Sequence, residues 1–317
     1  MPSQRWHSAR HTVPVAAPAG VVYGLLADAP RWPLLLPSCV HAERVDSDRA
    51  GDSLRLWQLH HGQVRSALVR RALHPRERGI AFELRDPLLP DAPARGGWNV
   101  SPGPAGHCLL TLHQEHHPAH PAPGQAPGTL DTQVRAELAA VAEAAERWDR
   151  LDELLFSFED SVYVCGSPEI VYDFLYRIAD WADLVPHVEH AEVTEDRPGV
   201  QSTVLHTSDP GTGDTVHSRA VRLCFPAAGR IVDKATVTPD LVAAHCGEWY
   251  LEPDARGVRV ARTHQVMLRE SAVQRVLGAG ALPVDARRHV REQLTRTSTQ
   301  TLTLARWHAE SALRRLR

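Results

Sequence analysis

The chain repeats itself, and this internal duplication limits its fold more than any other feature. VVYGLLADAPRWPLLLPSCVHAE, which starts at Val21, aligns with IVYDFLYRIADWADLVPHVEHAE, which starts at Ile170, at a separation of 149 positions (170 − 21 = 149). Farther along, the separation becomes 151 (222 − 71 = 151), which a loop insertion of two residues explains. The matched pairs include Tyr23 with Tyr172, Trp32 with Trp181, Arg71 with Arg222, Gly96 with Gly247, Trp98 with Trp249, and His113 with His264. Recurrence at fixed separations indicates two diverged copies of one structural unit.

The duplication predicts two domains, at residues 7–152 and 158–317. The length of 317 residues agrees with this division, because one hydrophobic core rarely extends beyond ~250 residues. The segment between the copies, LDELLFSFED, begins at Leu151, is apolar and contains neither Gly nor Pro. We therefore expect the two halves to pack together rather than to be loosely tethered.

The composition excludes several classes of protein. No stretch of the sequence approaches the ~18 unbroken apolar residues of a membrane span, and a net charge of -3 gives no basic footprint for nucleic acid. The start, MPSQRWHSARHTV, lacks the apolar run of a secretory signal, so we expect a cytoplasmic protein. The five cysteines are scattered and form no CxxC pair, which favours reduced, structural thiols.

Each copy has the pattern of an α+β domain. A short strand precedes an amphipathic helix, several alternating β-rich runs follow, and a helical segment closes the copy, from Pro283 onward in the second. This order predicts a curved antiparallel sheet wrapped around one helix, with an apolar cavity between them. The last helix of the first copy is short, so we expect its cavity to be smaller or more open.

Four segments carry a resemblance to a known family: VRLCFPAAGRIV at Val221, AAHCGEWYLE at Ala243, ARTHQVML at Ala261 and HVREQLTRTSTQTLTLARWHAE at His289. With the duplication, they resemble the two-domain polyketide aromatase/cyclases of the START/Bet v1-like (helix-grip) superfamily over nearly the whole chain. The resemblance implies an enzyme that folds a poly-β-ketone carried by an acyl carrier protein, closes the first ring by aldol chemistry and removes water. It further implies a chain reduced at C9 and closed between C7 and C12.

The resemblance also implies where the site residues lie. In such enzymes a pocket arginine and a histidine on the last strand are central, and these match Arg222 and His264 in the second copy and Arg71 and His113 in the first. Relatives often have an R-N-S motif on the last helix, where this chain has Arg296-Thr297-Ser298. The resemblance therefore points to Thr297 or Thr301 as the polar helix group.

The expected chemistry fits these residue types. An arginine in an apolar cavity stays protonated and can donate hydrogen bonds to the oxygen on which charge develops during ring closure. An imidazole can remove a proton from carbon and donate one to a departing hydroxyl. The expected wall residues are Tyr172, Trp181 and Trp249, with Trp32 and Trp98 at the equivalent positions of the first copy. This chemistry requires no metal or redox cofactor.

Each of these residues also has a structural interpretation. Strand arginines are usually exposed, the histidines are commonly satisfied core residues, and the repeated tryptophans more often belong to the core than to a ligand site. The first copy is a candidate for a stability or interface domain. The main rival function is a non-catalytic carrier of hydrophobic ligands on the same fold, because fold alone does not define a reaction.

One histidine cluster suggests a metal. His113, His116, His117 and His120 lie close together in the sequence, which raises a third hypothesis, a metal-dependent hydrolase or lyase. The spacing is not HExxH, and the cluster runs into a Pro-rich stretch, so the sequence favours a metal-free site.

Overall fold

The computed structural model describes residues 7–60, 62–85, 94–116, 129–208, 213 and 215–315. The chain divides into two compact units, Met1–Leu151 and Asp152–Arg317. The segment between the two predicted domains, residues 153–157, covers the end of helix α4 (Leu151–Leu154) and the start of strand β8 (Leu155–Val164). Each unit has a seven-stranded antiparallel sheet, and the two strand orders are equivalent: β1-β7-β6-β5-β4-β3-β2 and β8-β14-β13-β12-β11-β10-β9. Both units therefore have the predicted helix-grip fold.

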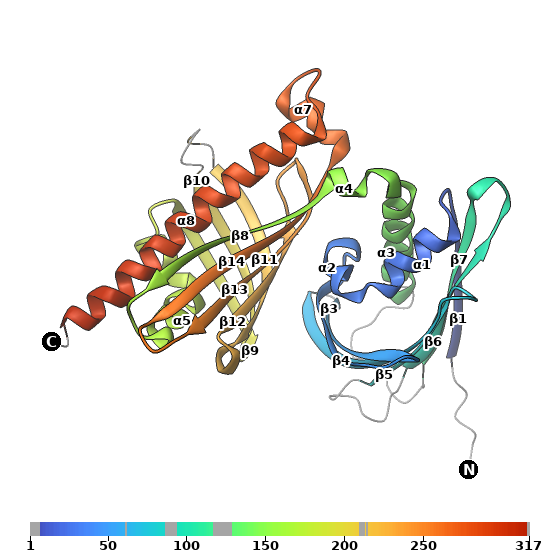
Figure 1. Ribbon diagram of the computed structural model, residues 1–317, viewed down its shortest axis with the longest axis horizontal. Coiled ribbons are helices and arrows are strands. Elements are labelled where there is room, and N and C mark those ends of the chain that lie inside the picture. Colours follow the sequence, from blue (N-terminus) through green and yellow to red (C-terminus); the bar gives the residue numbers. More distant parts are fainter. Residues whose placement is uncertain are drawn as a thin grey trace, which may run out of the picture. The chain divides into compact units, whose positions relative to one another are not determined.

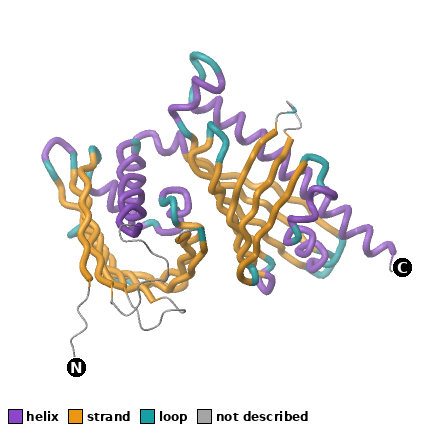
Figure 2. Tube along the Cα trace, turned by 180° about the vertical axis from the view of Figure 1, so that it is seen from behind, coloured by secondary structure: helices purple, strands orange, loops and turns teal. Residues whose placement is uncertain are grey.

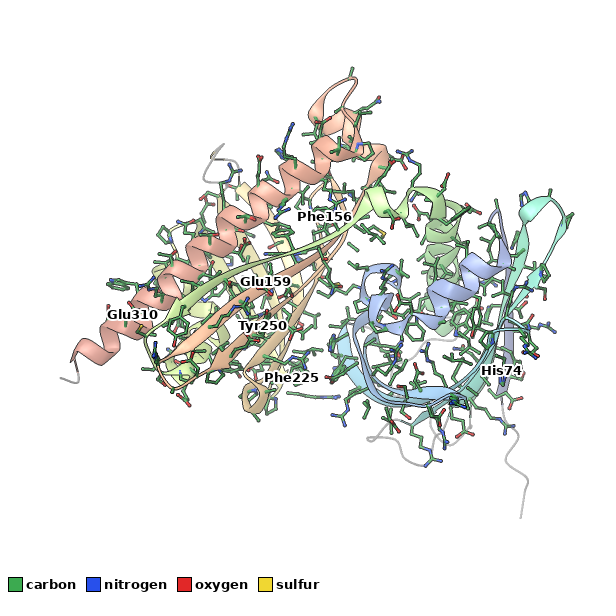
Figure 3. All side chains as sticks on the ribbon, in the orientation of Figure 1. His74, Phe156, Glu159, Phe225, Tyr250 and Glu310 are labelled. Atoms are coloured by element: carbon green, nitrogen blue, oxygen red, sulfur yellow. The ribbon has the colours of Figure 1, made fainter. Side chains whose placement is uncertain are left out.

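The first unit wraps its sheet around a short helix. Its elements are β1 (His7–Val15), α1 (Ala19–Ala27), α2 (Trp32–Leu35), β2 (Cys39–Ser47), β3 (Gly51–His60), β4 (Gln63–His74), β5 (Gly79–Arg85), β6 (Ala94–Pro102), β7 (Cys108–His116) and α3 (Thr129–Glu146). Figures 1 and 2 show the strongly curved sheet with α3 inside the curve. One continuous cluster of buried apolar side chains joins α1, the sheet and α3.

The second unit repeats this order with a longer closing helix. Its elements are β8, α5 (Pro168–Tyr176), α6 (Trp181–Leu184), β9 (Val188–Arg197), β10 (Val200–Ser208), β11 (Thr215–Phe225), β12 (Arg230–Val237), β13 (Val242–Pro253), β14 (Val258–Leu268), α7 (Val273–Leu277) and α8 (Pro283–Arg315). Helix α8 runs along the sheet beside β8 (Figure 1). Pro168 starts α5 behind the N-cap Ser167, as expected from the fixed φ of proline.

The core of the second unit is divided in two. One buried cluster joins α5, the sheet and the C-terminal part of α8 through Leu302, Ala305 and Ala309. The other joins α7, the sheet and the N-terminal part of α8 through Ala286 and Val290. The middle of α8, which carries Thr297 and other polar residues, faces a cavity rather than either cluster.

No helix in the described part of the chain is both long and apolar enough to cross a membrane.

Candidate active site

A cavity of about 390 Å³ lies between the sheet and α8 of the second unit. Strands β10 to β14 form one wall, and the middle of α8 forms the other. The wall is mostly apolar, and its buried polar side chains include Arg222 on β11, Arg262 and His264 on β14, and Ser298 and Thr301 on α8. An apolar cavity with a few convergent polar groups is the usual form of a small-molecule site.

Two histidines on neighbouring strands form the centre of the polar wall. His245 on β13 and His264 on β14 are joined by a hydrogen bond of 3.0 Å between Nε2 of His245 and Nδ1 of His264. The ring of Phe158 stacks on His264 at a centroid distance of 4.7 Å. Nε2 of His264 is buried and has no hydrogen-bond partner among the described residues. This nitrogen is therefore unpaired in the described part of the chain, on a residue that lines the cavity.

A carboxylate and a hydroxyl lie on the other side of His264. Oδ2 of Asp160 on β8 is 4.0 Å from Nε2 of His264, beyond hydrogen-bond distance. The same oxygen accepts a hydrogen bond of 2.5 Å from the hydroxyl of Ser298 on α8. Asp160 thus links the sheet to the helix beside the free imidazole nitrogen.

Burial keeps both imidazoles neutral. Loss of solvent lowers the pKa of His245 to about 4, with a further lowering by the charge of Arg262 that Asp233 partly offsets. Burial, Arg262 and His245 together hold the pKa of His264 well below its ordinary value. A neutral imidazole with an unpaired nitrogen is in the protonation state that can accept a proton.

Arg262 and Asp233 form an ion pair beside the histidines. The Nη2 of Arg262 donates to Oδ1 of Asp233 at 2.9 Å, and the guanidinium lies 5.0 Å over the ring of Trp249. Burial raises the pKa of Asp233, but the charge and hydrogen bonds of Arg262, together with the charges of His245 and Arg222, lower it overall. A Cβ on Gly247 would lie 2.4 Å from Nη2 of Arg262, so only glycine leaves room for this arginine.

Arg222 lines the cavity and also holds helix α5 in place. Its Nη2 donates to the carbonyl of Leu175 at 2.5 Å, and its Nη1 donates to Oε1 of Gln201 at 2.6 Å and to the carbonyl of Tyr176 at 3.4 Å. These carbonyls are at the C-terminal end of α5, where helix carbonyls lack partners within the helix. Arg222 forms no direct ion pair in the described part of the chain, although the charge of Asp233 on the next strand acts on it. It therefore contributes a positive charge to the cavity wall.

Arg71 has the same position in the first unit but a different partner. It donates to the carbonyls of Leu26 and Ala27 at the end of α1, both at 3.0 Å. Its Nη2 also forms a 2.6 Å ion pair with Asp52, and both side chains are buried. Asp52 pairs with Arg71 across the strands as Gln201 pairs with Arg222. The charge of Arg71 is thus neutralised where that of Arg222 is not.

His113 is not the structural counterpart of His264. Gly247 pairs with His264 across β13 and β14, whereas the matching Gly96 pairs with Gln114 across β6 and β7. A shift of one residue moves a strand side chain to the opposite face. The His113 side chain is accordingly 45% exposed, against 4% for His264. The sequence pairing was wrong by one residue here, and the structure does not bring His113 into a shared site with Arg71.

The predicted wall residues divide into two groups. Trp181, Trp249, Thr297 and Thr301 line the cavity. Tyr172 packs against the adjoining core cluster, as Trp32 and Trp98 do against the core of the first unit. The indole of Trp181 donates to the carbonyl of Phe174 at 3.0 Å, so its polar atom is already occupied.

The prediction missed five polar residues that the fold gathers here: Asp160, Asp233, His245, Arg262 and Ser298. A signal for some of them was present, because residues two apart on a strand share a face. His245 is two residues from Gly247, and Arg262 is two residues from His264.

The metal hypothesis is only partly covered by the structure. His117 and His120 lie outside the described residues. Among the residues that are described, no group of three or more His, Cys, Asp or Glu side chains could hold a metal ion.

The fold and cavity define a class of protein with two tandem helix-grip domains and, in the second, a mostly apolar pocket with a few buried polar groups. Two protein-family models, both described as polyketide cyclase/dehydrase and lipid transport, match residues 15–141 and 156–301. The chain belongs to this family.

Relatives of this class resemble the whole chain. The granaticin polyketide synthase bifunctional cyclase/dehydratase of Streptomyces violaceoruber is 31% identical over 99% of this chain and 97% of that protein. The actinorhodin polyketide synthase bifunctional cyclase/dehydratase of Streptomyces coelicolor is 34% identical over 93% of this chain and 95% of that protein.

Two solved structures match both units together. The di-domain ARO/CYC BexL from the BE-7585A biosynthetic pathway has a TM-score of 0.82 and 33% identity, covering 96% of this chain and 99% of that chain. The di-domain ARO/CYC StfQ from the steffimycin biosynthetic pathway has the same TM-score and coverage with 26% identity.

Proposed function

We propose that this protein closes the first ring of a poly-β-ketone and dehydrates it to an aromatic ring, using the cavity of the second unit. The proposal depends on one observation, that two chemically complementary groups lie on the wall of the same cavity. These are the free Nε2 of His264 and the cation of Arg222. The names of its relatives, which are polyketide synthase cyclases/dehydratases, support the same reaction class.

Arg222 is suited to stabilise the oxygen that becomes negative during aldol closure. An arginine stays protonated at neutral pH even when burial lowers its pKa, as it does here. Because its partners are neutral amide and carbonyl oxygens, its charge is free to act on a substrate oxygen. In an apolar cavity such an interaction is stronger than in water.

His264 is suited to the elimination of water. Its neutral Nε2 takes a proton from the carbon next to a carbonyl, and the carbon–hydrogen electron pair forms an enolate. The same nitrogen then delivers that proton to the departing hydroxyl, so that the carbon–oxygen bond breaks and water leaves. Proton balance is complete with one imidazole, and such acid–base catalysis contributes ~100-fold or more.

We further propose an acyl carrier protein as the donor of the chain, a chain reduced at C9, and closure between C7 and C12. These finer features rest on the family resemblance. The cavity supports the general requirement, because a wall that holds one folded conformer of a flexible chain gives a large entropic advantage.

The test is reconstitution with a minimal polyketide synthase and ketoreductase. We expect wild-type protein to yield an aromatised product, and His264→Gln to lower its rate of formation ~100-fold or more. The matched control is His113→Gln, a change at the aligned histidine on the outer face of the first unit, which should leave the rate unchanged.

Two results would contradict the proposal. Undiminished product from His264→Gln would remove the acid–base role from this cavity. Ligand binding without any product from the wild-type protein would favour the non-catalytic carrier instead.

A further inference from the structure

The cavity holds a second imidazole that the chemistry above leaves without a role. His245 contacts His264 directly, lines the same cavity and lies on the adjacent strand. The two rings are only 15° from coplanar, with centroids 5.3 Å apart. Because a ring N–H points in the plane of its ring, this arrangement suits an in-plane hydrogen bond.

The hydrogen bond couples the proton positions of the two rings. In a neutral pair only one of the two facing nitrogens carries the shared hydrogen. If Nδ1 of His264 donates, its Nε2 is bare and can accept a proton. If Nε2 of His245 donates instead, Nε2 of His264 carries a hydrogen and cannot act as a base.

We infer that His245 is a positioning residue whose Nε2 accepts the Nδ1 hydrogen of His264 and thereby keeps Nε2 of His264 bare toward the substrate. This inference rests on the proposed dehydration. When His264 takes the proton from carbon, its Nδ1 hydrogen stays on the bond to His245, which orients the imidazolium and shares its charge. When Nε2 gives the proton to the leaving hydroxyl, both rings return to their starting forms.

The surroundings of the pair leave His245 as the group that can set this tautomer. The Asp160 carboxylate lies 4.0 Å from Nε2 of His264, beyond hydrogen-bond distance. Asp160 accepts from Ser298 instead. Asp160 therefore makes no hydrogen bond to Nε2 of His264, and the hydrogen bond from His264 to His245 is the contact that can fix the tautomer.

The first unit lacks this pair. By strand pairing, Ala94 and Gln114 take the positions of His245 and His264. An alanine offers no acceptor. The hydrogen-bonded pair of His245 and His264 is thus a feature of the second unit and not of the fold that both units share.

The experiment compares two variants of the full-length chain. His245→Gln keeps an acceptor near the position of Nε2, whereas His245→Leu removes it at similar volume. We expect His245→Leu to lower kcat ~100-fold with KM changed less than about threefold, and His245→Gln to recover at least tenfold of that loss. The matched control is His217→Gln, on the exposed outer face of β11, which should behave as wild type.

A second measurement is independent of turnover. Long-range ¹H–¹⁵N spectra of histidine-labelled protein distinguish the two neutral tautomers, and the His264 signals are those lost in His264→Gln. We expect the tautomer with hydrogen on Nδ1 in the wild type, and its replacement or averaging in His245→Leu.

Certain outcomes would overturn the inference. They are a wild-type His264 with hydrogen on Nε2, or a His245→Leu variant with unchanged kcat. Absence of product from the wild type would instead refute the proposed function and leave the tautomer measurement valid.

Discussion

Two imidazoles buried in one cavity make the second unit sensitive to acid. The pKa of His245 falls to about 4 in the folded chain, mainly through burial, against about 6.5 in an unfolded chain. Between these values the unfolded state binds more protons than the folded state, so stability is lost as the pH falls from about 6.5 to 4. At ~1.4 kcal/mol per pKa unit, His245 alone contributes ~3 kcal/mol to this loss.

We therefore expect the free energy of unfolding to fall by a few kcal/mol between pH 7 and pH 4.5, and expect His245→Gln to flatten that dependence. Urea denaturation at a series of pH values measures both. His217→Gln, at an exposed position, should retain the slope of the wild type. A slope that is the same in all three proteins would show that the buried pair is not its source.

At the scale of elements, each unit has an arginine that joins a strand to the end of the first helix. The strand is β4 in the first unit and β11 in the second. Arg71 fixes α1 and Arg222 fixes α5 through their terminal carbonyls. The residues were predicted as catalytic, and the structure shows that each also has a structural contact. The repeat of Arg71 and Arg222 therefore has a structural explanation that does not depend on catalysis.

Replacing Arg71 and replacing Arg222 should lower the stability of the protein by different amounts. Arg71→Met leaves the buried Asp52 with one other ion pair among the described residues, to the partly exposed Arg44, and breaking a buried pair costs up to ~3–5 kcal/mol. Arg222→Met leaves neutral acceptors without their donor, and we expect this to lower the free energy of unfolding by ~1–3 kcal/mol. We expect denaturant unfolding to rank them in that order, with the exposed Arg70→Met close to wild type. Equal losses of stability in the Arg71→Met and Arg222→Met variants would mean that the Asp52 carboxylate does not set the cost of losing Arg71.

The elements themselves were largely predictable, with one informative exception. The order of strand, helix, β-rich runs and closing helix followed from periodicity, but the sequences of β2 and β9 give a weaker strand signal. Both are edge strands rich in charged and polar residues, as edges usually are, so alternation of apolar residues is weak there. The site was less predictable because Asp233, His245 and Arg262 come together only through strand pairing.

At the scale of the whole chain, the two units show how one fold carries different interiors. Strand pairing places Phe82 and Leu112 of the first unit where the second has Asp233 and Arg262. Leu112 is buried in the continuous apolar core, and Phe82 packs against it. The ion pair of the second unit thus occupies positions that apolar side chains fill in the first.

A double variant tests whether these polar side chains are needed for the reaction. The double variant Asp233→Phe/Arg262→Leu gives the second unit the apolar side chains that the first unit has at these positions. Replacing a buried ion pair by apolar side chains is often neutral or stabilising by ~1–4 kcal/mol, whereas Arg262→Leu alone leaves Asp233 charged and unpaired, at ~3–5 kcal/mol. We therefore expect the double variant to unfold at a urea concentration no lower than wild type and the single variant to be clearly destabilised. In reconstitution the double variant should form no aromatised product, because the polar environment of His264 is lost while the fold remains. If the double variant is stable and still forms product at the wild-type rate, the polar wall of the second cavity is not where the reaction occurs.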